Sequence, residues 1–134
     1  MHALVVGLGS IGRRHLTVLR EVAPGCTITA WRRAGASGDL PPGVDRVVGS
    51  AAEALALRPA FAVIATPASV HLAAARTLAE AGLPLLVEKP FSDRLGGVNA
   101  IIDLSARNGA ALAVAYNLRF HPPLQAVRAA VAGG

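Results

Sequence analysis

A glycine pattern near the N-terminus constrains the fold of this chain more than any other feature. Gly7, Gly9 and Gly12 follow the spacing GxGxxG, and they come directly after an apolar run, His2 to Gly7, that predicts a short buried strand. The next stretch, Ile11 to Glu21, mixes apolar residues and arginines in a pattern that indicates a helix. The glycines therefore lie in a turn that leads from a strand into a helix.

Each glycine of this turn has a physical reason to be there. The first permits the tight turn, the second lets main-chain N–H groups approach a pyrophosphate, and the third lets the helix pack closely on the strand. Ser10 and Ile11 lie between the second and third glycines and open the helix, whose N-terminus favours a bound anion. The pattern predicts a dinucleotide-binding turn. A flexible glycine turn that binds nothing is the alternative interpretation.

The rest of the chain alternates strand-like and helix-like segments. Ser50 and Glu53 have the spacing of a capping box at the start of one short helix, and Gly82 is placed as the C-cap of another. Further strands are expected at Thr27 to Trp31, Arg46 to Val48, Phe61 to Ala65, Leu85 to Val87 and Ala111 to Ala115, and further helices up to Leu57, at Val70 to Ala81, Arg94 to Asn108 and Pro123 to Ala132. This alternation predicts an α/β fold with a doubly wound parallel sheet, the Rossmann fold.

Composition fits such a fold and excludes several other classes. Hydrophobic residues make up 53% of the 134 residues and aromatic residues only 4%, which suits strands covered by helices on both faces. Cys26 is the only cysteine, so an internal disulfide is excluded and a reducing, cytoplasmic setting is expected. No Cys and His cluster has the spacing of a metal site, and no uninterrupted apolar stretch predicts a membrane span. The net charge of +5 comes with scattered arginines and no interleaved aromatic residues, which argues against nucleic-acid binding.

The end of the second predicted strand bears on which dinucleotide would bind. The fingerprint expects an Asp or Glu about 20 residues past the glycines, where it holds the ribose 2′-hydroxyl. Here Trp31, Arg32 and Arg33 occupy that place, and the first later carboxylate is Asp39. Two guanidinium groups would attract a 2′-phosphate, so we expect NADP(H) in preference to NAD(H). Alternatively, both arginines are solvated loop charges and Arg32 stacks on the adenine.

Polar residues follow three more predicted strands at the edge where ligands bind in open parallel sheets. These candidates are Thr66 and Pro67, Glu88 and Lys89, and Tyr116 and Asn117. His71 follows the first pair closely and would either approach the nicotinamide or cap and pack. Lys89 is the only lysine beside twelve arginines, which suggests a place where a proton-donating ammonium is needed. An exposed ion pair is the alternative for Glu88 and Lys89.

Four segments together resemble the glucose-fructose oxidoreductase, inositol dehydrogenase and MocA family, written Gfo/Idh/MocA. They are GLGSIGRRHL, ATPASVH, VEKPFS and AYNLRFHP, which occur in the family's order along the whole chain. The resemblance implies that Lys89 contacts the cofactor ribose and the substrate, and that Glu88 joins the ribose network. It also implies that Asn117 and Arg119 lie by the cofactor or substrate cleft.

The chain also departs from the family pattern. Family enzymes continue into a second domain that carries further substrate-binding residues, whereas this chain stops at Gly134. We expect residues 1–120 to form the dinucleotide-binding domain and residues 121–134 a helix leading toward the missing domain. The final helix carries apolar residues at helical spacing, which suggests a homo-oligomer or a partner domain. These residues are Leu124, Val127 and Val131.

By resemblance, the function expected is half of an NAD(P)-dependent oxidoreductase that acts on a sugar, a cyclitol or a related carbonyl or alcohol. Lys89 would polarise the substrate oxygen or relay its proton, and Glu88 would orient it. As this isolated chain, the half would bind cofactor without completing catalysis. One alternative is a non-catalytic dinucleotide-binding module that works as a sensor or with a partner chain. Another is a site for an adenosylated metabolite, because the glycine turn would contact a phosphate or a ribose and not the nicotinamide.

Overall fold

The computed structural model describes residues 1–32 and 40–133, and these residues form a six-stranded sheet in which every pairing is parallel. The strands are β1 (His2–Val6), β2 (Thr27–Trp31), β3 (Arg46–Val48), β4 (Phe61–Ile64), β5 (Leu85–Val87) and β6 (Leu112–Val114). Their spatial order is β3-β2-β1-β4-β5-β6. The chain therefore winds outward from β1 in one direction and from β4 in the other. The switch point between β1 and β4 is the place where ligands bind in folds of this kind.

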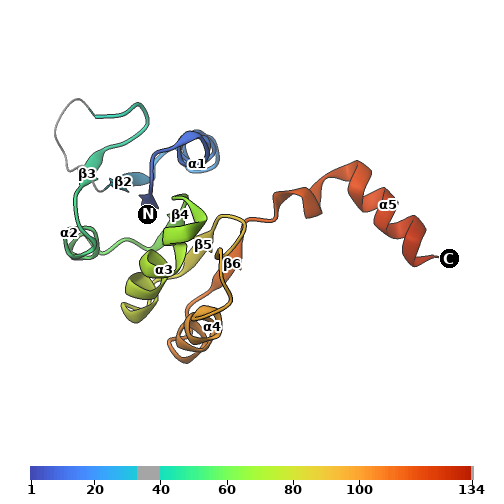
Figure 1. Ribbon diagram of the computed structural model, residues 1–134. Coiled ribbons are helices and arrows are strands. Elements are labelled where there is room, and N and C mark those ends of the chain that lie inside the picture. The colour runs from blue at the N-terminus through green and yellow to red at the C-terminus, as the bar shows by residue number, and fades with distance from the viewer. Residues whose placement is uncertain (33–39, 134) are drawn as a thin grey trace.

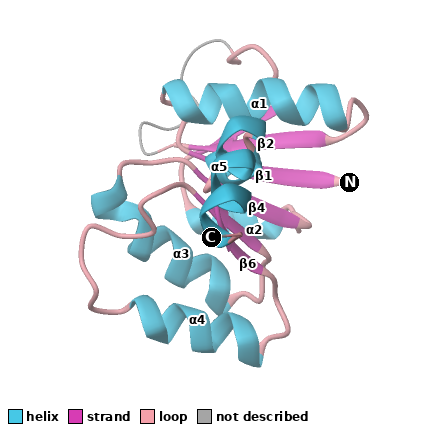
Figure 2. Cartoon of the chain, turned by 90° about the vertical axis from the view of Figure 1, so that its right-hand side faces the viewer, coloured by secondary structure: helices cyan, strands magenta, loops and turns pink. Residues whose placement is uncertain are grey.

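Helices cover both faces of this sheet, as the sequence predicted (Figure 1). They are α1 (Ser10–Val22), α2 (Ala51–Ala56), α3 (His71–Glu80), α4 (Val98–Arg107) and α5 (Pro122–Ala132). The core residues of α2, α3 and α4 belong to one apolar cluster, and those of α1 belong to the other. Figure 2 shows α3 and α4 on the side of the sheet away from α1. The doubly wound fold is thus confirmed.

Strand β1 lies at the centre of the sheet and contributes to both apolar clusters. Leu4 and Val6 face the cluster of α2, α3 and α4, whereas Ala3 and Val5 face the cluster of α1. Side chains alternate between the two faces of a strand, so an uninterrupted apolar run is what a doubly covered strand requires. All four side chains are buried. The glycine turn that follows β1 is therefore anchored in the centre of the core.

Local signals set most of the helix ends. Oγ of Ser50 accepts a hydrogen bond from the main-chain N–H of Glu53 at 3.2 Å, which confirms the predicted cap of α2. Gly82 follows α3 with a φ of +72°, a conformation that favours glycine at a helix end. The expectation that a helix begins at Arg94 was wrong, because α4 begins only at Val98. Its N-cap is Gly97, whose φ of +90° is not helical.

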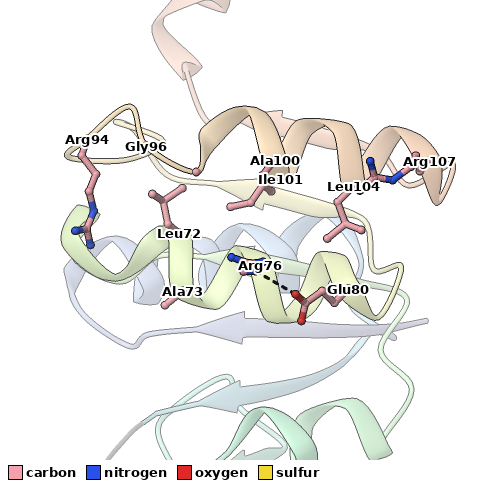
Figure 3. Close-up of a pocket in the computed structure, with 11 residues that line it drawn as sticks. Leu72, Ala73, Arg76, Glu80, Arg94, Gly96, Ala100, Ile101, Leu104 and Arg107 are labelled. Carbon is pink, nitrogen blue, oxygen red and sulfur yellow. Dashed lines mark hydrogen bonds and ion pairs between the residues drawn. The ribbon is translucent and has the colours of Figure 1, made fainter.

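Helices α3 and α4 lie side by side and leave a groove of about 660 Å³ between them (Figure 3). Its lining combines the apolar side chains of Leu72, Ile101 and Leu104 with small residues and four charged ones. Nε of Arg76 lies 3.1 Å from Oε1 of Glu80, and both side chains are largely exposed. Such an exposed pair within one helix contributes little to stability. None of the site residues expected from the sequence lines this groove.

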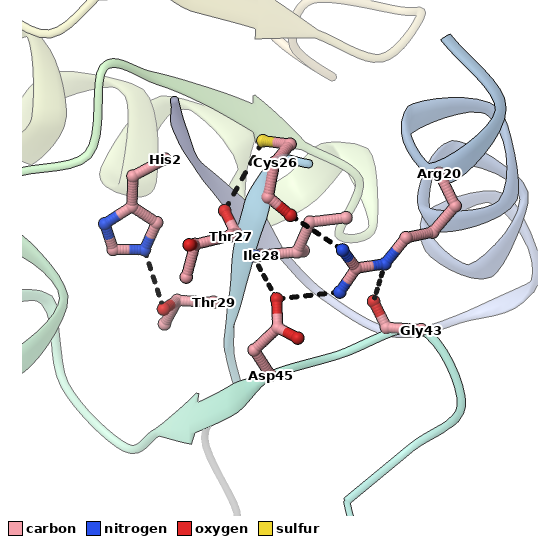
Figure 4. A network of polar contacts seen from close by, with 8 residues as sticks. All are labelled: His2, Arg20, Cys26, Thr27, Ile28, Thr29, Gly43 and Asp45. Atoms are coloured by element: carbon pink, nitrogen blue, oxygen red, sulfur yellow. Dashed lines mark hydrogen bonds and ion pairs between the residues drawn. The ribbon is translucent and has the colours of Figure 1, made fainter. Parts of the chain in front are cut away.

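A polar network ties the C-terminal part of α1 to β2 (Figure 4). Nη2 of Arg20 and the main-chain N–H of Ile28 both donate to Oδ2 of Asp45, each at 2.7 Å. The same guanidinium donates to the carbonyl oxygens of Cys26 and Gly43. These bonds hold the pKa of Asp45 below its usual 3.8, first through the N–H of Ile28 and then through Arg20. The network lies at the amino ends of β2 and β3, whereas the glycine turn follows the carboxyl end of β1.

The last part of the chain leaves the sheet after β6. A 3₁₀ turn, η2 (Asn117–Phe120), leads into α5, which lies apart from the sheet and the other helices (Figure 1). No side chain of α5 is buried, and its apolar residues are exposed. Among residues 1–32 and 40–133, no helix has the length and apolar character needed to cross a membrane.

Candidate functional site

Two of the three glycines are required by close packing. Gly7 has a φ of +92°, and a β-carbon there would lie 2.8 Å from Cγ2 of Thr66 and 3.0 Å from the carbonyl oxygen of Ala65. A β-carbon on Gly12 would collide with the carbonyl oxygen of Gly7. Larger residues at either position would push α1 away from β1 and β4. The first and third glycines therefore have the structural roles that the fingerprint assigns to them.

The second glycine faces open space. Gly9 is exposed, and a β-carbon on it would meet no atom within 4 Å. It is the N-cap of α1, where no side chain caps the helix and no acidic residue lies in the first turn. Ser10 is exposed and Ile11 half-buried at this same helix start. The helix N-terminus thus presents unsatisfied N–H groups and a positive dipole end to an uncrowded place, which fits a pyrophosphate.

Beside the glycine turn lies a pocket of about 570 Å³ at the carboxyl ends of β1, β2 and β4. Its lining is mostly apolar and includes Trp31 and Arg32 from the end of β2, and Thr66 and Pro67 from the end of β4. Residues of α3 close its other side. A flat apolar group with a polar rim, such as an adenosine, fits this composition. Arg33, the second arginine expected here, lies outside the described residues.

Thr66 reaches both the glycine turn and this pocket. Its Oγ1 is buried and has no hydrogen-bond partner among the described residues. A buried hydroxyl without a partner carries an unfavourable desolvation cost, and buried polar side chains of this kind are uncommon. The hydroxyl thus lies unpaired, but covered by neighbouring atoms, at the switch point of the sheet. The role of Thr66 in cofactor binding stays a prediction.

His71 is only 1% exposed, and both of its ring nitrogens lie close to main-chain carbonyl oxygens. Nδ1 is 3.0 Å from O of Pro90, and Nε2 is 2.6 Å from O of Thr66. The packing role considered for this histidine agrees with that geometry. With both nitrogens engaged and the ring buried, any effect of His71 on a cofactor would be indirect.

Glu88 is also buried, at 8% exposed. Nε2 of His15 donates to its Oε1 at 2.8 Å, and the main-chain N–H of Lys89 donates to its Oε2 at 3.2 Å. Sequence reasoning missed His15, although a signal exists. His15 lies on the same side of α1 as Gly12 and Leu16, which are both buried. A polar side chain on a buried helix face needs a hydrogen-bond partner, and this need was the signal.

Lys89 differs from its neighbour because its side chain is exposed. It follows β5 at the carboxyl edge of the sheet, and its peptide bond to Pro90 is cis. Nζ has no hydrogen bond or ion pair within residues 1–32 and 40–133. The exposed ion pair considered as an alternative does not form, because the carboxylate of Glu88 is turned toward His15. The ammonium group therefore remains available at this edge.

Asn117 and Arg119 lie farther along the chain, in η2 after β6, and both are exposed. The guanidinium of Arg119 lies over the ring of Phe120, 5.5 Å from its centre. The structure brings the glycine turn, Thr66 and Glu88 together around the start of α1. It leaves Asn117 and Arg119 on the segment where the chain departs from the sheet.

Comparison with known proteins identifies relatives with this architecture. Residues 1–116 match the family model described as the Gfo/Idh/MocA oxidoreductase family with an NAD-binding Rossmann fold. The chain is 31% identical to UDP-N-acetylglucosamine 3-dehydrogenase of Acidithiobacillus ferrooxidans, over 97% of this chain and 41% of that protein. It is 32% identical to D-apiose dehydrogenase of Paraburkholderia graminis, over 97% of this chain and 36% of that protein.

A solved structure agrees with these sequence matches. An oxidoreductase from Agrobacterium radiobacter, in complex with NAD⁺, L-tartaric acid and magnesium, superposes with a TM-score of 0.81 at 25% identity. The match covers all of this chain and 40% of that one. The chain thus spans about two fifths of the length of its relatives. With a family model that covers most of its residues, the chain belongs to the Gfo/Idh/MocA oxidoreductase family and carries that family's NAD-binding Rossmann fold.

Proposed function

We propose that the chain is the cofactor-binding part of an oxidoreductase that uses NADP(H) in preference to NAD(H) and acts on a sugar, a cyclitol or a related ketone. The observation that carries this proposal is the asymmetry of the glycine turn. It is packed tightly against β1 and β4 through Gly7 and Gly12, and it is open at Gly9. A turn that only connected two elements would have no need for an open glycine beside an uncapped helix.

Different residues would bind different parts of the dinucleotide, according to their chemistry. Main-chain N–H groups of Ser10 and Ile11 would hold the pyrophosphate, together with the unpartnered hydroxyl of Thr66. The pocket beside Trp31 and Pro67 would take the adenosine. Arg32 directly follows β2, near the place where the dinucleotide fingerprint has a carboxylate that would repel a 2′-phosphate.

Arg32 supports the preference for a 2′-phosphate because it lines the adenosine pocket. A guanidinium group matches phosphate geometry with paired N–H donors, and its positive charge would attract the 2′-phosphate. Arg33 would add a second positive charge from the adjoining segment. With the uncharged 2′-hydroxyl of NAD(H), the same two residues would form only weaker hydrogen bonds.

The reacting end would lie toward Lys89. A bound nicotinamide supplies hydride chemistry, which proteins exploit by placing a substrate carbon against it. Lys89 offers an exposed ammonium group that can polarise a substrate oxygen or hold and release its proton. Glu88 orients the segment that follows β5, because its carboxylate accepts a hydrogen bond from the main-chain N–H of Lys89. Asn117 and Arg119 would border the cleft where the chain leaves the sheet.

The substrate class rests on the relatives. Two of them are named for activity on UDP-N-acetylglucosamine and on D-apiose, and both names describe sugar dehydrogenation. Because this chain spans about two fifths of their length, its own activity and substrate are proposals.

Calorimetric titration with NADPH and NADH tests the cofactor preference. We expect NADPH to bind the wild-type chain more tightly than NADH does. Arg32→Ala should lower the affinity for NADPH roughly tenfold or more, as expected for a lost hydrogen bond to a charged group, and should change the affinity for NADH little. Arg128→Ala is the matched control, since Arg128 lies on the exposed helix α5. Equal affinities for both cofactors, or tighter binding of NADH, would overturn the proposed preference.

A further inference from the structure

The segment from Glu88 to Asp93, here called the corner, follows β5 and has few main-chain hydrogen bonds of its own. The N–H of Glu88 donates to the carbonyl oxygen of Ile64, which is the last bond of the strand ladder along this segment. From Lys89 to Asp93, no main-chain N–H donates to another main-chain group in the part of the chain that the structure describes. Within the chain, this segment is therefore held by side-chain contacts, which include the packing of Phe91 against the apolar core and the hydrogen bonds of two further side chains.

One such side chain comes from α1. His15 donates from Nε2 to Oε1 of Glu88 at 2.8 Å, and Oε2 of the same carboxylate accepts the main-chain N–H of Lys89 at 3.2 Å. The side chains of His15 and Glu88 are 19% and 11% exposed, so the pair is largely shielded from water. Glu88 is thus fixed by a residue of the helix whose N-terminus forms the proposed pyrophosphate site.

The other side chain comes from α3, on the opposite face of the sheet. Nδ1 of His71 lies 3.0 Å from the carbonyl oxygen of Pro90, which directly follows Lys89. Nε2 lies 2.6 Å from the carbonyl oxygen of Thr66. A doubly protonated ring can donate to both carbonyls, whereas a neutral ring can donate to only one. The ring of His71 thus lies between Thr66, the second residue after β4, and Pro90 in the segment after β5.

We propose that His15 and His71 are positioning residues for Lys89. His15 acts through the carboxylate of Glu88, on the N-terminal side of Lys89, and His71 acts through the carbonyl of Pro90, on its C-terminal side. The ammonium group sits on a flexible stem of four carbons, so its reach depends on where the main chain at Lys89 is held. The two histidines come from helices on opposite faces of the sheet and fix that main chain from both directions.

This inference rests on the proposed function for its consequence, which is the placement of Lys89 against a cofactor and substrate. Its geometry can be tested without either. Lys89 is the only lysine in the chain, so labelling with ¹⁵N-lysine gives a spectrum with a single main-chain amide signal. That amide is the N–H that donates to Glu88. Its rate of exchange with solvent reports directly on whether the corner is held.

The His15 variants separate the hydrogen bond from the bulk of the ring. In His15→Leu, which cannot donate to Glu88, we expect the amide of Lys89 to exchange roughly tenfold faster or more, the factor for losing a hydrogen bond to a charged group. His15→Gln keeps an N–H donor near the place of Nε2, and we expect it to restore much of the protection. His2→Leu is the matched control, because His2 also bonds through both ring nitrogens, to Leu57 and Thr29, away from the corner.

The His71 variants separate its two contacts. The amide group of Asn reaches the place of Nδ1 and can donate to Pro90, whereas that of Gln reaches the place of Nε2 and can donate to Thr66. We therefore expect protection of the Lys89 amide to fall in His71→Gln and to stay closer to wild type in His71→Asn. Thermal melts of all variants identify any that lose the fold, and the His15→Gln and His71→Asn proteins then carry the comparison.

Faster exchange in His15→Leu and His71→Gln, with recovery in His15→Gln, protection close to wild type in His71→Asn and no change in His2→Leu, supports the proposal. Wild-type exchange in both of the first two variants overturns it. So does an equal loss of protection in the control, because that result would reflect general destabilisation. Failure of NADPH to bind would contradict the proposed function, and it would leave the exchange result as an independent outcome.

Discussion

The carbonyl oxygen of Gly7 occupies the place that a β-carbon on Gly12 would take. This relationship sets the distance between α1 and β1, because the oxygen belongs to rigid main chain and cannot move aside. It also explains why the glycine pattern is so restrictive in sequence. A third glycine is needed wherever a helix starts this close to the strand before it.

Gly12→Ala is therefore expected to destabilise the fold by roughly 1 to 3 kcal/mol, the usual range for overpacking a tight site. Urea unfolding followed by circular dichroism measures this change. Gly25→Ala is the control, since a β-carbon on Gly25 would meet no atom within 4 Å. An equal and small effect for both variants would show that α1 can shift away from β1 at little cost.

Gly9→Val should behave in the opposite way. Its main chain has φ −66° and ψ −172°, which a branched residue can adopt, and the space around its β-carbon is open. We expect the free energy of unfolding to change by less than about 0.5 kcal/mol, as for other substitutions without steric conflict. NADPH binding should be lost, because the side chain would fill the proposed pyrophosphate position. Retained affinity in calorimetry would remove Gly9 from the binding site.

Thr66→Val tests the unpartnered hydroxyl. Replacing a buried hydroxyl that has no partner by a methyl group should leave stability unchanged or raise it slightly. NADPH affinity should fall by roughly threefold to tenfold if Oγ1 donates to the cofactor, the range for one hydrogen bond. Ser105→Ala is the matched control, because Oγ of Ser105 is likewise buried without a partner in the described chain, on α4. A loss of affinity in both variants would argue against a contact between Thr66 and the cofactor.

The sequence predicted the fold well because its signals are local. Strand β1, the glycine turn and the capping pair of Ser50 and Glu53 each follow from neighbouring residues. The start of α4 was predicted four residues too early. Helical periodicity continues through Gly96 and Gly97, and only the positive φ of Gly97 shows where the helix starts.

The site was harder to predict because its contacts join distant segments. His15 and Glu88 are 73 residues apart, and no spacing rule connects them. The sequence indicated Glu88 through its place after a strand, but it could not show that the carboxylate faces α1. His71 presents the same difficulty, since its two carbonyl partners lie after different strands. Parallel sheets bring such residues together through topology, which local patterns do not encode.

Stability should depend on pH through Asp45. Its pKa is lowered in the folded chain, mainly by the N–H of Ile28 and then by Arg20, so its charged form stabilises the fold. That contribution is complete above the unfolded pKa near 3.8 and is lost as the pH falls through the lower folded value. The difference in unfolding free energy between wild type and Asp45→Asn should be about 1 kcal/mol near neutral pH, since the pair is partly exposed, and should shrink in acid. A difference that grows below pH 3.8 would contradict this account.

Helix α5 offers a test of association. Leu124, Val127 and Val131 are exposed on a helix that packs against neither the sheet nor the other helices. We expect the chain to self-associate through this surface at high concentration, and Val127→Asp to shift it toward the monomer. Light scattering across a concentration series measures the mass. A wild-type chain that stays monomeric at every concentration would contradict this prediction.

Trp31 provides the most direct measurement of the central claim, that a dinucleotide binds at the carboxyl edge of the sheet. It is the only tryptophan, and it lines the pocket assigned to the adenosine. We predict that NADPH changes its fluorescence in a saturable way, that an adenosine 2′,5′-bisphosphate fragment produces much of the change, and that Gly9→Val abolishes the response to NADPH. An unchanged Trp31 signal at NADPH concentrations that saturate binding by calorimetry would place the cofactor elsewhere and contradict the account.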